Sequence, residues 1–209
     1  MSNLRCEFLG WPETEPTVRL DYRRFSYAGK FVVGSTGKAV IRDADRSAGS
    51  TLPPIDERLP EGHSERAFDR SVLAAISFDE DRTDSDVLVF RYVTVRRDRR
   101  GEGLGPMLVR FVVDRAQKRG YDRCRIAVNN PFAYEALYRA GFAFTGETSG
   151  MAELVLERPT AAPASRDGDR YRAGLELFLD RETIQPRERS FLERRIDADS
   201  PTTLTSDRP

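Results

Sequence analysis

The sequence predicts an α/β protein of the α+β kind, with a mixed, mostly antiparallel, twisted sheet flanked by helices. Residues 71–78 and 87–95 are apolar, β-branched runs separated by an acidic turn, which is typical of an antiparallel strand pair. Residues 107–118 then show helical spacing and lead to a third apolar run at 124–128. A right-handed crossover through that helix places strands 87–95 and 124–128 parallel to each other.

The region before residue 70 is expected to be mostly strand and turn. Residues 1–16 are poorly patterned, and residues 17–25 alternate loosely enough to predict a strand. Residues 31–33 and 39–41 flank a Gly-containing loop, which indicates a hairpin. Residues 42–69 are polar and rich in Pro, Gly and Ser, so they are predicted to form a long surface loop.

The last third of the chain is predicted to contain a hairpin, a linker and two helices. Residues 142–144 and 151–156 bracket a turn, and a helix over 132–139 precedes them. Residues 171–180 and 187–196 have helical propensity but few apolar residues, which suits docking helices or a partner-binding tail. Residues 71–157 are expected to form the core of the domain, and residues 1–70 are expected to complete it with strands and loops. Residues 158–170 are expected to be a linker, and residues 171–209 a helical extension with a disordered end.

Composition excludes several functional classes. The chain has 34 basic and 34 acidic residues, so a general nucleic-acid surface is not expected. No apolar run is long enough to span a membrane, and no signal-peptide core stands at the start, so a cytoplasmic protein is predicted. Cys6 and Cys124 suggest neither a disulfide framework nor a zinc site. His63 is the only histidine and lies in a polar stretch without metal-ligand spacing, so no metal is expected.

The turn after strand 87–95 has the features of an anion site. It carries several arginines and three alternate glycines, and Pro106 suggests that a helix begins there. Backbone N–H groups at such a helix start favour phosphate, and glycine lets the backbone approach it closely. The spacing fits neither the dinucleotide-binding fingerprint nor a Walker A loop.

The pattern Arg100-Gly101-Glu102-Gly103-Leu104-Gly105 resembles the pyrophosphate-binding loop of the GNAT superfamily of N-acetyltransferases, whose cofactor is acetyl-coenzyme A. A second motif supports the resemblance. Asn130 ends the following strand, and Ala133, Tyr134 and Tyr138 precede Gly141-Phe142, as in that family. The resemblance covers about residues 71–157. Tyr138 stands one residue closer to the glycine than in the commonest form of the family, and the region before residue 70, which normally shapes the acceptor pocket, is not clearly matched.

The resemblance implies a splayed parallel strand pair that exposes backbone groups to the cofactor. Val93 and Val95 would pair with the pantetheine arm, and the amides of Arg100, Gly101, Gly103 and Gly105 would hold the pyrophosphate. Arg96, Arg97 or Arg99 would meet the 3′-phosphate. Asn130 would bind the cofactor, although capping of the next helix is an alternative role.

For the chemistry, Tyr138 is expected to protonate the CoA thiolate, with Tyr134 as the second choice and packing against the sheet as the alternative for either. Asp79, Glu80 and Asp81 are candidate bases, although an acidic run is usually a solvated turn. The expected function is acetyl transfer from acetyl-CoA, as co-substrate, directly to an unidentified primary amine on a small molecule or a protein.

Three other functions stay open at this stage: an acyltransferase that uses a longer acyl-CoA, a catalytically silent acyl-CoA-binding module, and a nucleic-acid or partner-binding protein that uses the basic loop. Whether the chain forms a homodimer is also open.

Overall fold

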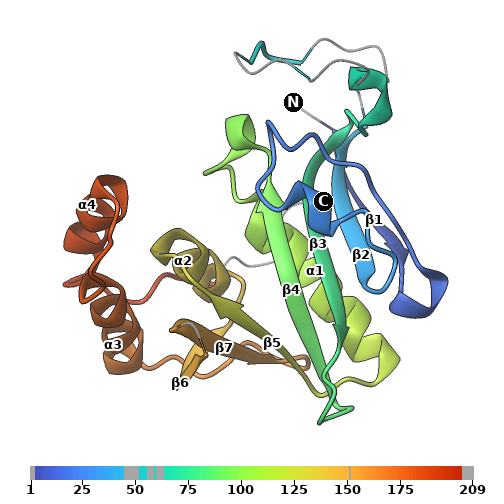
Figure 1. The fold of residues 1–209 in the computed structure, drawn as a ribbon. Coiled ribbons are helices and arrows are strands. Elements are labelled where there is room, and N and C mark those ends of the chain that lie inside the picture. The colour runs from blue at the N-terminus through green and yellow to red at the C-terminus, as the bar shows by residue number, and fades with distance from the viewer. Residues whose placement is uncertain (1–2, 45–51, 56–58, 60–63, 151, 204–209) are drawn as a thin grey trace. The chain divides into compact units, whose positions relative to one another are not determined.

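The computed structural model describes residues 3–44, 52–55, 59, 64–150 and 152–203. The chain forms two compact units, and each is described by itself. The first unit comprises residues 1–79 and 90–112, and the second comprises residues 80–89 and 113–209. Among the described residues, one sheet contains seven strands in the order β1-β2-β3-β4-β5-β7-β6 (Figure 1). It is mostly antiparallel, with β4 and β5 as its one parallel pair, so the predicted fold class is confirmed.

The first unit is built on antiparallel strands. β1 (Leu4–Gly10) pairs with β2 (Gly37–Asp43), which in turn pairs with β3 (Val72–Glu80). β4 (Val87–Val95) begins in the second unit and ends in the first. Strands β2 and β3 are buried on both faces, and residues 39–41 of β2 and 72–76 of β3 are accordingly all apolar. A core cluster forms against them and contains Val18, Leu20, Phe25, Ala28, Phe31, Val40, Val72 and Ala75.

Two sequence predictions in this unit are wrong. Residues 17–25 form turns, not a strand, because Asp21 O accepts the backbone N–H groups of Arg24 and Phe25 at 2.9 and 3.0 Å. The alternation reflects side chains that enter the core from an irregular segment. The predicted hairpin is also absent: residues 31–33 form no strand, Val33 is exposed, and β2 pairs instead with β1, which the sequence reasoning did not recognise.

The second unit contains β5 (Arg123–Val128), β6 (Ala143–Ser149) and β7 (Glu153–Pro159). The hairpin of β6 and β7 was predicted, and β7 also pairs antiparallel with β5. Cys124 on β5 is fully buried, and burial raises the pKa of its thiol to about 12. Cys6, on β1 of the first unit, is half-buried, and burial also raises the pKa of its thiol.

Four helices complete the described fold. They are α1 (Leu104–Arg119), α2 (Pro131–Arg139), α3 (Gly168–Leu179) and α4 (Pro186–Arg195). All four were predicted within a few residues. Helices α1 and α3 both begin a few residues earlier than predicted, and Pro106 is the third residue of α1 and not the first. None of the helices in the described part of the chain has the length and apolar character needed to cross a bilayer.

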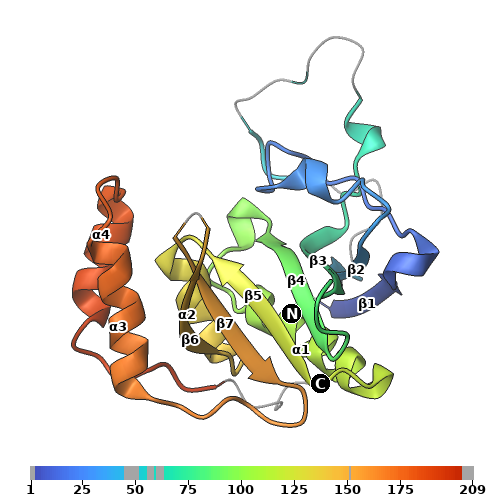
Figure 2. The ribbon, with the colours of Figure 1, turned by 60° about the horizontal axis from the view of Figure 1, so that its bottom comes forward.

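The C-terminal helices dock onto α2 within the second unit, and Figure 2 shows α3 and α4 side by side. Glu135 on α2 is buried and binds both Arg139, at 2.5 Å, and Arg195 on α4, at 2.8 Å. Phe132 stacks against Phe191 at a centroid distance of 4.8 Å. An ion pair to a buried carboxylate and an aromatic contact therefore favour the docking-helix interpretation of this segment over a partner-binding tail.

Gly174 lets α3 approach α2 closely, and this contact gives a test of the docking. A Cβ at position 174 would overlap the Tyr134 hydroxyl. Ala is normally better than Gly inside a helix, but Gly174→Ala should destabilise the protein by about 1–3 kcal/mol because it overpacks the contact. Gly168→Ala, at the start of the same helix, meets nothing within 4 Å and serves as the control. Urea denaturation of both variants measures the difference, and equal stability would contradict the docking contact.

Candidate functional site

The turn between β4 and α1, in the first unit, has the backbone geometry of an anion cradle. Gly101 and Gly103 take positive φ angles of 86° and 78°, in the left-handed region that glycine adopts without strain. A Cβ at either position would meet no protein atom within 4 Å. The space above both glycines is therefore open, and a ligand can approach the backbone there.

The backbone donors of this turn point to the same use. Outside helices and strands, the described residues show no backbone hydrogen bond donated by the N–H groups of residues 101–105. The first hydrogen bond of α1 runs from Met107 N–H to Gly103 O at 3.1 Å. Gly101 and Glu102 are exposed, while Gly103 and Gly105 are half-buried. Unused donors at a helix N-terminus form an anion-binding site, and we call residues 100–105 the amide loop.

The arginines around the amide loop divide into held and exposed groups. Arg100 donates to Ser26 Oγ at 3.0 Å, which ties the loop to a segment 74 residues earlier. Arg99 binds Glu102 at 2.7 Å, and this hydrogen bond is the largest cause that raises the pKa of Arg99 and lowers that of Glu102. Arg96 is 1% exposed and binds Asp98 at 2.7 Å.

These positions separate the three arginines that were predicted to meet a 3′-phosphate. The burial of Arg96 keeps it from the surface, and Arg99 already has a carboxylate partner. Arg97 is exposed, and its side chain has no hydrogen bond or ion pair among the described residues. Arg97 is therefore the arginine of the three that is available to a ligand.

The predicted strand residues lie directly before the amide loop. Val93 and Val95 are half-buried on β4, and Val95 lies against the loop, since a Cβ on Gly105 would stand 3.6 Å from Val95 Cγ2. Val95 O accepts a long hydrogen bond of 3.4 Å from Arg100 Nε. Their pairing with a cofactor stays a prediction, as does the splaying of the strand pair.

Asn130 and Tyr138 belong to the second unit. Asn130 caps α2, because its Oδ1 accepts the N–H of Ala133 at 2.9 Å. The capping role that the sequence left as an alternative is thus present, and a cofactor-binding role for Asn130 stays a prediction.

Tyr138 lies in a buried aromatic cluster with Tyr134 and Tyr171, and it is 1% exposed. Its hydroxyl accepts the N–H of Phe144 at 3.0 Å and lies 3.3 Å from the hydroxyl of Tyr134. Tyr134 in turn is 3.1 Å from the carbonyl of Tyr171. Since each hydroxyl has one proton, the consistent chain has Tyr138 donating to Tyr134 and Tyr134 donating to Tyr171 O. Burial raises the pKa of Tyr138, so this geometry favours the packing role over the acid role.

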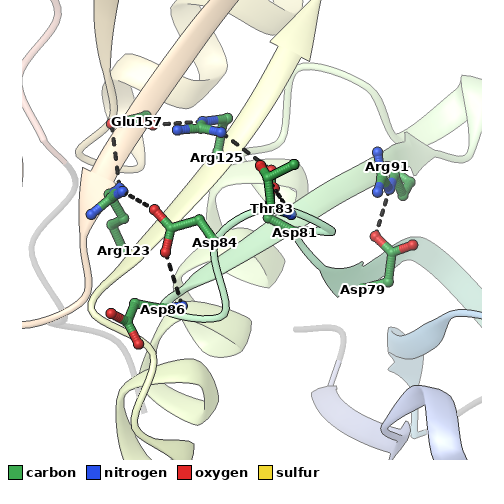
Figure 3. Close-up of polar contacts among 9 residues, drawn as sticks. All are labelled: Asp79, Asp81, Thr83, Asp84, Asp86, Arg91, Arg123, Arg125 and Glu157. Carbon is green, nitrogen blue, oxygen red and sulfur yellow. Dashed lines mark hydrogen bonds and ion pairs between the residues drawn. The ribbon is translucent and has the colours of Figure 1, made fainter.

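The carboxylates proposed as bases at the end of β3 already have hydrogen-bond or ion-pair partners within the protein. Figure 3 shows Asp79 bound to Arg91, with a distance of 2.5 Å between Asp79 Oδ1 and Arg91 Nε. Glu80, outside the figure, lies 3.4 Å from the hydroxyl of Tyr121. Asp79 belongs to the first unit, while Glu80 belongs to the second.

Asp81, in the second unit, holds a turn together. It accepts the N–H and the hydroxyl of Thr83 at 2.9 and 2.7 Å, and it binds Arg125 at 3.2 Å (Figure 3). The Thr83 bonds, supported by Arg125, lower the pKa of the Asp81 carboxyl below its usual value. A lowered pKa makes a carboxylate a weaker base, so Asp81 fits a structural role.

His63 lies outside the described residues. Ser26, which contacts Arg100, was missed by sequence reasoning because nothing in its local pattern indicates a partner so far along the chain. Among the described residues, no group of three or more His, Cys, Asp or Glu side chains is placed to hold a metal ion.

Residues 50–142 match the model of the acetyltransferase (GNAT) family. This segment belongs to the GNAT superfamily. The match includes the amide loop and the Asn130–Phe142 motif, the two features on which the sequence resemblance rested. A search of the curated proteins finds no match to the chain.

Solved GNAT structures also resemble the chain. A Lactobacillus plantarum protein assigned as an N-acetyltransferase has a TM-score of 0.48 and 15% identity, with 75% of this chain and 98% of that chain covered. The IAA acetyltransferase from Bacillus cereus ATCC 14579 gives 0.45 and 17%, with 75% and 99% covered. The yncA protein of Salmonella typhimurium, assigned as an acetyltransferase and solved with its cofactor acetyl-CoA, gives 0.42 and 15%, with 63% and 69% covered.

The tyrosine chain predicts how Tyr138→Phe will behave. The substitution removes the acceptor of the buried Phe144 N–H, so we expect a loss of stability of about 1–3 kcal/mol. We expect the rate of CoA release, and its dependence on pH above neutrality, to change little. Tyr134→Phe is the control, since it breaks the same chain one residue further on. A fall in kcat of about 100-fold or more in folded Tyr138→Phe protein, absent from Tyr134→Phe, would instead establish the acid role.

Proposed function

We propose that the protein is an acetyl-CoA-dependent N-acetyltransferase that transfers the acetyl group directly to a primary amine. The observation that carries the proposal is the amide loop, in which consecutive N–H groups find no backbone acceptor among the described residues and two glycines leave the space above them open. The pyrophosphate of acetyl-CoA supplies the acceptors that these donors lack. The GNAT family match at residues 50–142 adds independent support from sequence.

The proposed site assigns roles as follows. The N–H groups of Arg100, Gly101, Gly103 and Gly105 hold the pyrophosphate, and Arg97 meets the 3′-phosphate. The backbone of Val93 and Val95 pairs with the pantetheine arm, as an added strand pairs with an exposed edge. Asn130 is assigned to the cofactor in addition to its capping bond. No metal is required for this chemistry.

The reaction balances without a further reactant. The amine nitrogen attacks the thioester carbonyl, a C–N bond forms and the C–S bond breaks. The amine loses a proton and the CoA thiolate gains one. A free primary amine has a pKa of about 10.4, so a base assists its attack at neutral pH. The acid role that the resemblance implies for Tyr138 competes with packing, which its burial favours, and the tyrosine variants above decide between the two.

The acceptor is an amine on a small molecule or on a protein. The segment that precedes β2 supports an acceptor surface unlike that of the usual family member, because in its described residues it forms 3-10 turns in place of α-helices. Tyr27 on this segment is exposed, takes a positive φ of 59° and lies against Tyr92 of β4. Such strain in an aromatic residue is uncommon and often marks a functional site.

A second function has one observation in its favour. The carboxylates Asp79 and Asp81 are both engaged with arginines, which suits a catalytically silent acyl-CoA-binding module. The two functions differ in one result. If acetyl-CoA binds but no amine in a panel of small amines, peptides and protein N-termini releases free CoA, the silent module is supported and the transferase is rejected.

The amide loop is tested by Gly103→Ala. We expect it to weaken acetyl-CoA binding by about tenfold or more, which corresponds to about 1.4 kcal/mol, because the methyl group occupies the space in front of the loop and strains a positive φ. Gly146→Ala is the matched control: Gly146 also has a positive φ, of 90°, and open space around it, but it lies on β6. Isothermal titration measures the affinity, and thermal unfolding confirms that both variants fold. Equal affinity in the two variants would remove the amide loop from the site.

The role of Arg97 is tested with two ligands. Arg97→Gln should weaken CoA binding two- to fivefold, as expected for an exposed ion pair of up to about 1 kcal/mol. The same variant should bind 3′-dephospho-CoA as well as the unmodified protein does. Arg82→Gln, which changes an exposed arginine of the second unit, serves as the control. An equal loss for both ligands would place Arg97 away from the 3′-phosphate.

A further inference from the structure

A small cavity lies in the first unit, beside the base of the amide loop. Its volume of about 10 Å³ is enough for one water molecule or one ion of similar size. Three arginines, Arg24, Arg70 and Arg96, contribute to its walls, and aromatic and aliphatic side chains such as Phe25 and Phe68 fill the gaps between them. A cavity of this size with several cationic walls is unusual, since buried charges are normally paired.

Each of the three arginines has a buried nitrogen without a hydrogen-bond partner among the described residues. Arg96 is 1% exposed, and Asp98 engages its Nε and Nη2 but leaves Nη1 unpaired. Arg24 is 7% exposed, and its Nη2 donates to Pro53 O at 2.7 Å while Nε makes no hydrogen bond. The Nε of Arg70 is buried and also unpaired. Three unmet donors thus belong to side chains that line one cavity.

The carboxylates beside the cavity are already in use. Asp21 receives three hydrogen bonds from Arg23 and lies 3.5 Å from Arg24 Nε. Asp69 accepts from Arg42 and twice from Ser71. These carboxylates have little capacity left for the unmet donors.

The charged side chains around the cavity carry a net positive charge. Among the described residues, three arginines and two carboxylates line the cavity: Arg24, Arg70 and Arg96, with Asp21 and Asp69. Burial lowers the pKa of Arg24, so its surroundings penalise the charge more than they compensate for it. One negative charge in the cavity would balance the group.

We propose that this cavity binds a small monovalent anion, of about the size of chloride, in contact with Arg24, Arg70 and Arg96. An anion suits the site better than water because it needs only donors, whereas a water molecule must also place its own two protons. The two carboxylates that could accept those protons are already hydrogen-bonded. Charge-assisted hydrogen bonds from guanidinium groups are also the stronger kind.

The bound anion has a structural role next to the amide loop. Arg97 N–H donates to Arg24 O at 2.9 Å, and Arg96 N–H donates to Leu73 O at 2.8 Å. An anion that holds the side chains of Arg24 and Arg96 therefore fastens residues 21–25 to the start of the loop. This role does not depend on acetyl transfer, and it holds for any ligand of the loop.

The test compares chloride with gluconate at constant ionic strength, because gluconate is too large for the cavity. The melting temperature of the protein should rise by about 3 °C as chloride replaces gluconate. This is the shift expected in a chain of this size when the chloride concentration is about ten times its Kd. Arg70→Gln should lose most of this rise. Arg66→Gln, which changes an exposed arginine nearby, should keep it. Crystals soaked in bromide should show an anomalous peak between Arg24, Arg70 and Arg96.

Two results would overturn the proposal. The first is a melting temperature that is equal in chloride and gluconate, together with no bromide peak in the cavity; the cavity then holds water only. The second is an equal chloride effect in unmodified protein and Arg70→Gln, which places the anion elsewhere. If Arg70→Gln fails to fold, the bromide position in unmodified crystals still decides the question.

Discussion

The backbone N–H groups of residues 101–105, for which the described residues supply no backbone acceptor, are the constraint on which the site depends. Peptide donors that find no partner are costly when they are buried, so a protein either exposes them or reserves them for a ligand. Here the left-handed glycines Gly101 and Gly103 turn the chain so that successive amides stay accessible. The start of α1 directly behind them adds the positive end of a helix dipole. The geometry needs no side chain, which explains why the amide loop can tolerate an acidic residue, Glu102, among its members once Arg99 pairs with it.

The two units bury their apolar side chains in different ways. In the first, the segment that precedes β2 is irregular, yet its apolar side chains complete a core against β2 and β3. In the second, helices α3 and α4 cover α2 and seal the tyrosine cluster. The docked helices explain why Tyr138 is buried. Its position in the sequence differs by one residue from the commonest family motif, and its hydroxyl is already part of a hydrogen-bond chain.

Local sequence was sufficient for the central and C-terminal elements and insufficient near the N-terminus. β4 was predicted to the residue, because a β-branched run, a glycine turn and a periodic helix follow one another within 33 residues. The strand predicted at residues 17–25 is absent, because burial in an irregular segment produces the same alternation as a strand. The amide loop could be predicted from its glycines, whereas the contact of Arg100 with Ser26 could not, since it joins residues that are 74 positions apart. The ion pairs of Asp79 and Asp81 could not be predicted either, because their arginine partners lie on other strands.

The two cysteines have a consequence for the order of events in any acyl transfer. A thiol attacks a thioester as its thiolate, and burial disfavours that form at both Cys6 and Cys124. Neither sulfur is suited to carry an acyl group from donor to acceptor. This disfavours a route through an acyl-cysteine and supports the proposed direct transfer, in which acetyl-CoA and the amine are bound at the same time.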